Sequence, residues 1–137
     1  MATALSTQVK QLATTLAVGG NEQELIATLK STAFRNQQIS DSQMTALLIV
    51  ANEHKLNPWT NEIYAFPQNG GIQPIIGIDG WLKLANNNSQ FDGLEYDYKF
   101  SDSGELLAIT CQVYRKDRSR AMEATELMSE NKRNTQP

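Results

Sequence analysis

Apolar residues recur at helical spacing in the first part of the chain. One face of residues 4–18 is apolar at every third or fourth position, which predicts a helix that ends at Gly19-Gly20. The apolar positions are Leu5, Val9, Leu12 and Leu16. Asn21 is a typical N-cap for a second helix, because Glu22 and Glu24 then fall in its positively polarised first turn. The pattern therefore predicts two amphipathic helices in succession.

A third helix is predicted by a capping motif and a broad apolar surface. In Ser40-Asp41-Ser42-Gln43, the serine oxygen and the glutamine side chain can each bond a backbone amide at a helix start. Ile49 and Val50 add apolar surface opposite the main apolar face, and a helix that is apolar nearly all round is typical of the centre of a core. That main face consists of Met44, Leu47, Leu48 and Ala51. Asn57-Pro58 is expected to end the helix, because the residue before a proline disfavours helical conformation.

The pattern changes to strands in the middle of the chain. Two β-prone runs, Glu62–Phe66 and Ile72–Ile76, flank Asn69-Gly70, which is among the stronger sequence signals for a tight hairpin. Pro74 lacks the amide that a central strand donates, so the second strand is expected at a sheet edge or at a bulge. Gly77-Ile78-Asp79-Gly80 then favours a tight strand-to-helix turn capped by Asp79, although it also resembles the Gly-x-x-Gly clamp of some RNA-binding proteins.

A short helix and three strands complete the predicted fold. The helix carries Trp81 and fades into a run of asparagines. Apolar and charged residues alternate from Leu94 to Phe100, which is typical of a half-buried strand. A second strand, containing Leu107 to Val113, and a shorter one around Met122–Leu127 are expected to pair with it. The predicted class is α+β: N-terminal helices followed by β-hairpins and a small antiparallel three-stranded sheet, with a short helix between.

Composition and charge narrow the class of protein. With 137 residues, 40% of them hydrophobic and 20% charged, the chain is typical of one soluble globular domain, and residues 1–137 are expected to form a single domain. No apolar run approaches the roughly 20 residues of a membrane-spanning helix and no secretory signal begins the chain, which indicates a cytoplasmic protein. Residues 1–114 carry 6 basic and 11 acidic side chains, whereas residues 115–137 carry 6 and 4. The positive charge is therefore concentrated late in the chain.

Residues for catalysis or cofactor binding are sparse. The one histidine, His54, lies near a predicted helix end, where an imidazole more often serves the terminal carbonyls than catalysis. The one cysteine, Cys111, alternates with aliphatic residues and is expected in a core. The sequence contains neither a phosphate-binding loop ending in Gly-Lys-Ser/Thr nor a nucleophile elbow. We therefore expect no enzyme activity, no ATP use, no cofactor and no metal site.

Basic and aromatic side chains are the features that could contact nucleic acid. A basic run follows the second long strand, where cations can bind successive phosphates and release counterions; a solvated turn is the alternative interpretation. This run consists of Arg115, Lys116, Arg118 and Arg120. Four aromatic residues could stack bases, although such residues more often fill a core or a subunit interface, as the helical spacing of Trp81 favours. They are Trp59, Tyr64, Phe66 and Trp81.

Several blocks of sequence resemble a known family in the same order. Met44–Asn52, Leu56–Thr60 and Glu62–Pro67 are similar to the signature stretch of the Redβ/RecT family of phage single-strand annealing proteins. Further similar blocks are Glu22–Arg35, Gly77–Trp81, Gln90–Gly93 and Tyr114–Arg118. The chain departs from the lambda-like pattern at Asn61 and in the Gln68-Asn69-Gly70 turn, which lack a lysine.

The resemblance implies a function, partners and a site. Family members bind single-stranded DNA, assemble into rings or helical filaments and pair complementary strands without ATP in the bacterial cytoplasm. The implied partners are single-stranded DNA, the annealed duplex intermediate and further copies of the chain, with a phage exonuclease for full-length members. Basic positions of the family's DNA-binding core match Arg115, Lys116, Arg118, Lys132 and Arg133, with Lys83 as an additional candidate. Lys116 and Arg133 are expected to matter most.

The resemblance also leaves a second function open. Family members continue into a basic, largely helical segment and then a partner-binding module, so we expect residues 1–137 to be the N-terminal oligomerisation and annealing core without those parts. Such a core could instead self-associate, or cap filaments of a longer protein, while binding DNA weakly. Salt dependence separates the two, because phosphate contacts weaken steeply with salt and protein packing does not.

Overall fold

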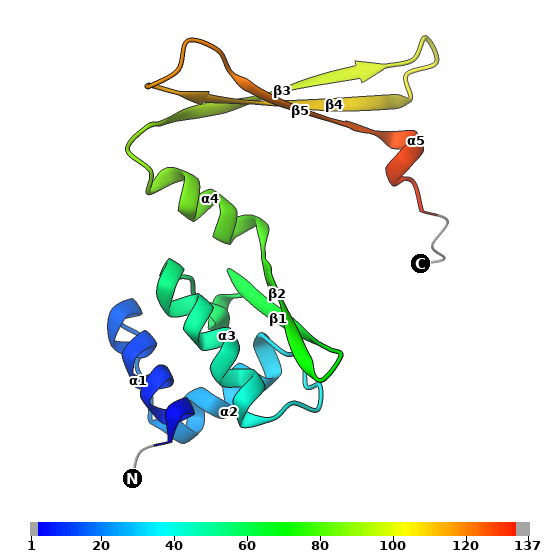
Figure 1. Cartoon of the computed structure of the whole chain (residues 1–137). Helices are drawn as coiled ribbons and strands as arrows, with labels where there is room; N and C mark the ends of the chain where they lie inside the picture. Colours follow the sequence, from blue (N-terminus) through cyan, green and yellow to red (C-terminus); the bar gives the residue numbers. More distant parts are fainter. Residues whose placement is uncertain (1–2, 134–137) are drawn as a thin grey trace. The chain divides into compact units, whose positions relative to one another are not determined.

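The computed structural model describes residues 3–133, and the chain divides into two compact units with a boundary after Ala85 (Figure 1). The first unit contains α1 (Ala4–Leu16), α2 (Glu22–Thr32), α3 (Asp41–His54), the 3-10 helix η1 (Pro58–Thr60), β1 (Ile63–Gln68), β2 (Gly71–Ile76) and α4 (Ile78–Asn86), which ends at the boundary. The second contains β3 (Phe91–Phe100), β4 (Leu106–Arg115), β5 (Met122–Leu127) and α5 (Met128–Asn131). The predicted α+β class and order of elements are confirmed. A single functional domain over residues 1–137 stays a prediction.

The hydrophobic core lies in the first unit, where the helices and the β1–β2 hairpin meet. Helices α1, α2 and α3 turn their predicted apolar faces inward, and burying one leucine stabilises the fold by about 1.5–3 kcal/mol. The largest fully buried side chains are Val9, Leu12, Leu29, Phe34, Met44, Leu47, Leu48, Leu56, Pro58 and Ile63. The amide of Ala65 in β1 donates to the carbonyl of Ala33 after α2 at 3.0 Å, which ties the hairpin to the helices.

Side chains cap α2 and α3 at the residues that the sequence indicates. Asn21 accepts the amide of Glu24 at 3.0 Å, and Glu24 accepts the amide of Asn21 at 3.3 Å. Ser40 and Gln43 exchange the same pair of bonds at the start of α3. A cap of this kind typically contributes about 1 kcal/mol to helix stability.

The predicted ends of α1 and α3 are wrong. Ala17, not the glycine pair, ends α1 by adopting a left-handed conformation with φ 53°, and its amide turns back to the carbonyls of the last turn. Lys55 ends α3 in the same way with φ 54°, before Asn57-Pro58 is reached. Both helices therefore end in left-handed caps on residues other than glycine, which the positions of glycine and proline in the sequence do not indicate.

The prediction that α3 lies at the centre of the core is confirmed, although its second apolar strip is not fully buried. Its Met44, Leu47, Leu48 and Ala51 face is fully buried, but Ile49 on the other side is 54% exposed and Val50 is only half-buried. Val50 is partly buried and packs against the core, so Ile49 is the exposed residue of the second apolar strip.

The β1–β2 hairpin matches its prediction. The register pairs Gln68 with Gly71 across the Asn69-Gly70 turn, whose φ angles of 50° and 79° are those of a type I′ turn. Pro74 pairs with Ala65, whose amide points away from β2 to Ala33. The proline therefore sits at a position where the ladder needs no donor, in a two-stranded sheet that has only edges.

The turn into α4 depends on glycine because two segments of backbone nearly touch. A Cβ on Gly80 would clash with the carbonyl oxygen of Glu62, and one on Gly77 would lie 2.8 Å from that of Asn61. The tight strand-to-helix turn is thus confirmed. Asp79 is not its cap, because α4 begins at Ile78 and Asp79 lies within the first turn.

The second unit is a three-stranded antiparallel sheet in the order β3-β4-β5. The predicted strands are confirmed, but the expected half-buried alternation is not. Tyr96, Tyr98 and Phe100 are 50%, 52% and 58% exposed. Cys111, paired with Tyr96, is partly exposed on the same face and not in a core. Among the described residues of this unit, Ala108 is the one buried apolar side chain.

Candidate nucleic-acid interface

The basic run forms the loop between β4 and β5, at one end of the three-stranded sheet (Figure 1). The amide of Lys116 donates to the carbonyl of Gln90 at 2.9 Å, which anchors the loop beside the start of β3. The side chains of Lys116, Arg118 and Arg120 are exposed, and within residues 3–133 none of them forms an ion pair. The loop therefore presents three cations to solvent.

Arg115 is the member of this run that already has an anionic partner. Its Nε and Nη2 atoms donate to the two carboxylate oxygens of Asp117, both at 2.8 Å. These hydrogen bonds lower the pKa of Asp117 and raise that of Arg115. A phosphate at Arg115 must compete with this carboxylate, so Arg115 is less available than its neighbours.

Lys132 and Arg133 lie at the opposite end of the same sheet. They follow α5, which leaves β5 at the end of the sheet where β3 and β4 are joined by their turn (Figure 1). Both are exposed, and the amide of Lys132 donates to the carbonyl of Met128 at 2.8 Å. A strand of the length of β5 spans about 20 Å, so the predicted basic residues form two groups and not one patch.

Lys83 belongs to the first unit and has a structural partner there. Its Nζ atom lies 2.8 Å from Oε2 of Glu62, which also accepts the amide of Asn57 at 2.8 Å. Both side chains of the ion pair are partly shielded. Lys83 thus fixes α4 to the segment before β1, and a contact with DNA stays a prediction.

The polar face of the three-stranded sheet is acidic and hydrogen-bonded. Tyr114 donates to Glu95 at 3.1 Å, which raises the pKa of the tyrosine, and Gln112 donates to Glu123 at 3.1 Å. Thr110 and Thr125 bond across the strands at 2.8 Å. Carboxylates on this face repel phosphates, so the ends of the sheet are the better places for a nucleic-acid backbone.

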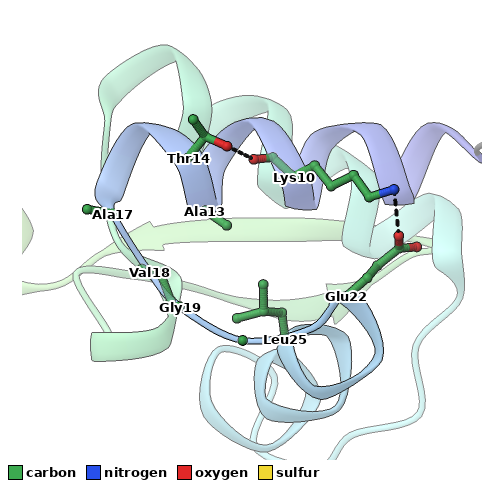
Figure 2. Close-up of a pocket in the computed structure, with 9 residues that line it drawn as sticks. Lys10, Ala13, Thr14, Ala17, Val18, Gly19, Glu22 and Leu25 are labelled. Carbon is green, nitrogen blue, oxygen red and sulfur yellow. Dashed lines mark hydrogen bonds and ion pairs between the residues drawn. The ribbon is translucent and has the colours of Figure 1, made fainter.

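Open cavities lie among the described residues of the first unit. One, of about 420 Å³, is closed on one side by an ion pair of 3.0 Å between Lys10 of α1 and Glu22 of α2 (Figure 2). The hydroxyl of Ser6 and the ammonium of Lys10 lower the pKa of Glu22. A second, more apolar cavity of about 490 Å³ lies between the first residues of α1 and the exposed side of α3. Neither gathers residues for acid–base or nucleophilic chemistry, and residues 3–133 contain no group of three His, Cys, Asp or Glu side chains that could hold a metal.

The four aromatic candidates have three different environments. Trp59 packs against the core and donates its indole N–H to the carbonyl of Leu25 at 3.0 Å. Trp81 is 58% exposed on α4, so a core role within this chain is wrong. Tyr64 and Phe66 are half-buried neighbours on one face of β1, beneath the guanidinium of Arg35. Alternation in β1 indicates the aromatic pair, but no sequence signal indicates that Arg35 lies over it.

Comparison with known proteins identifies the class of the chain. Residues 20–136 match the model of the RecT family, and the chain therefore belongs to that family. It is also similar to the recombination protein bet of Escherichia phage lambda, with 47% identity over 135 residues. That match covers 97% of this chain and 49% of the lambda protein, so the chain spans about half the length of this curated relative. In the described part of the chain, no helix has the length and apolar character needed to cross a bilayer.

Proposed function

We propose that this chain anneals complementary single strands of DNA without ATP, as a recombination factor of a bacteriophage. The observation that carries the proposal is 47% identity to a phage recombination protein across 97% of the chain. Membership of the RecT family supports it. On this proposal the chain acts in the cytoplasm of the bacterial host and is not an enzyme.

The proposed mechanism uses charge and positioning. Cations of the β4–β5 loop bind phosphates of one strand and release counterions, while the bases stay free to pair. Base pairing with a second strand then supplies the free energy of annealing, so no nucleotide hydrolysis is required. Lys116 and Arg118 are the best placed, because they are exposed and have no carboxylate partner within residues 3–133.

Assembly is part of the proposal. Lys116 and Arg133 lie at opposite ends of one sheet, so a strand that contacts both runs along about 20 Å of protein. Few phosphates are bound by one copy, and several copies in a ring or filament would add their contacts along the same strand. The proposed partners are thus single-stranded DNA, the annealed duplex and further copies of the chain. A phage exonuclease is a further proposed partner of longer family members.

A second candidate function is self-association with weak DNA binding. The exposed aromatic row of β3 favours it, because soluble proteins rarely leave a contiguous apolar face of a sheet uncovered. The acidic polar face of the same sheet favours it as well. On this reading, DNA binding is weak and assembly persists at high salt.

The experiment is annealing of two complementary labelled oligonucleotides, followed by fluorescence quenching without ATP at low and moderate salt. We expect a double Lys116→Ala and Arg133→Ala variant to lose most of the acceleration. The matched control is a double Lys30→Ala and Lys55→Ala variant, which removes the same charge from exposed positions of the first unit. Equal loss in both variants would contradict the assigned residues. No acceleration by folded, assembled wild type would favour the second candidate.

A further inference from the structure

Arg35 has an environment unlike that of the other basic residues. It follows α2 in an exposed turn, and its guanidinium carbon lies 5.3 Å from the ring centre of Tyr64 and 5.6 Å from that of Phe66. The two rings are 5.8 Å apart and nearly perpendicular, at 87°. They come from alternate positions of β1 and so share one face of the hairpin, where Gln73 and Ile75 pair with them.

The cation is held in place but is not neutralised. Within residues 3–133, the side chain of Arg35 forms no hydrogen bond and no ion pair, so its N–H donors are available. By contrast, each of three other basic residues forms an ion pair with a carboxylate: Lys10, Lys83 and Arg115. Strands β1 and β2 contain no charged residue, and Glu62, which precedes β1, is bound to Lys83. The hairpin face beneath Arg35 is therefore aromatic and brings no carboxylate to the guanidinium.

That combination matches the chemistry of a single-stranded nucleotide. A base offers an apolar, polarisable face to an aromatic ring or to a planar guanidinium, and its phosphate accepts a bidentate pair of hydrogen bonds from arginine. Rings that meet edge to face leave one ring face directed away from the other ring, against which a base can stack. Arginine is better suited than lysine here, because only its planar group can stack and donate in a fork at once.

We propose that Arg35, Tyr64 and Phe66 form a stacking site for one nucleotide of single-stranded DNA, with Arg35 on the phosphate or the base and a ring of β1 beneath the base. The site rests on the proposed function, since it assumes that the chain binds DNA. It lies entirely in the first unit and shares no residue with the basic groups of the second. Because stacking accepts any base, the site gives affinity without sequence preference.

The test measures binding of a fluorescein-labelled oligothymidylate by anisotropy at three salt concentrations, using the full chain. We expect Phe66→Leu to weaken binding about fivefold or more with an unchanged salt slope, because stacking does not depend on counterions. Arg35→Gln should weaken binding and also reduce the logarithmic salt slope by about 0.7, the value for one phosphate contact on a single strand. The matched control is Lys55→Gln, which removes one exposed charge of the same unit and should bind like wild type.

A second readout does not depend on the folding of any variant. An oligonucleotide carrying 5-iododeoxyuridine is bound to wild type and cross-linked by light, and the modified residue is found by mass spectrometry. Cross-links at Tyr64 or Phe66 support the site. Wild-type binding with unaffected variants, or with cross-links only elsewhere, overturns the site and leaves the proposed function standing. No binding by folded wild type overturns both.

Discussion

The first unit buries a cluster of apolar side chains from three helices and a hairpin. In the described part of the second unit, by contrast, Ala108 is the only apolar residue that is buried. The difference does not come from apolar content alone. Tyr96, Tyr98 and Phe100 are as apolar as many core residues, but they lie on one open face of a sheet whose other face is polar.

The two units differ in how their apolar side chains can be buried. Helices that pack around a hairpin cover one another, so the first unit closes a core by itself. A three-stranded sheet with one apolar face leaves that face exposed unless another surface packs on it. The first unit thus has the properties of a scaffold, and the second has those of a surface that makes contacts.

The largest expected loss of stability comes from a substitution in the core of the first unit. Leu47→Ala, at a fully buried position of α3, should lower the free energy of unfolding by about 2–5 kcal/mol. Phe100→Ala, at an exposed position of β3, should cost less than about 1 kcal/mol if its face is open in solution. Both are measured by urea unfolding followed by circular dichroism. A loss at Phe100 as large as that at Leu47 would show that the aromatic face is covered in solution.

A smaller loss of stability is expected where two segments of the backbone approach closely in the first unit. Gly80→Ala places a Cβ against the carbonyl of Glu62 and should cost about 1–3 kcal/mol, because α4 must shift away from β1. Gly19→Ala is the control, since open space surrounds that position and its φ lies outside the left-handed region. Thermal midpoints give the comparison. Equal midpoints for the two variants would contradict the close approach.

Removal of a helix cap should have a still smaller effect. Ser40→Ala removes the acceptor of the Gln43 amide and should cost about 1 kcal/mol in urea unfolding. Ser119→Ala, in the exposed loop of the second unit, should leave stability unchanged. A loss at Ser119 equal to that at Ser40 would mean that the loop is more tightly packed than its exposure indicates.

The smallest expected effect concerns the ion pair in the second unit. Because hydrogen bonds from Arg115 lower the pKa of Asp117, the pair persists above the ordinary carboxylate pKa and is lost only as pH falls through the lowered folded value. At neutral pH, Asp117→Asn should leave stability nearly unchanged and free Arg115 for phosphate. Binding of an oligonucleotide should then tighten and its salt slope should steepen by about 0.7. Weaker binding would contradict the competition between carboxylate and phosphate.

Local patterns predicted much of the fold, because local interactions determine those features. Capping residues such as Ser40 and the Asn69-Gly70 turn act within a few residues of sequence, and the structure confirms them. Glycine and proline do not mark the helix ends at Ala17 and Lys55, since these two residues adopt the left-handed cap conformation without being glycine.

Predictions of burial were less successful, because burial depends on contacts between elements that are distant in sequence. Alternation in β3 identifies an apolar face but not whether anything packs on it, and the apolar residues around α3 do not show that Ile49 is exposed. In the candidate site, Arg115 and Lys132 are close in sequence yet lie at opposite ends of a sheet, because β5 separates them. The position of Arg35 over two rings of β1 depends on a contact across about 30 residues of sequence, which no local pattern contains.

The most direct test of the account is the annealing rate of wild-type chain, with no ATP, against the spontaneous rate of the same two complementary strands. The account predicts acceleration that falls steeply between low and moderate salt and does not change when ATP is added. A folded, assembled sample that anneals the strands no faster than buffer alone would contradict it.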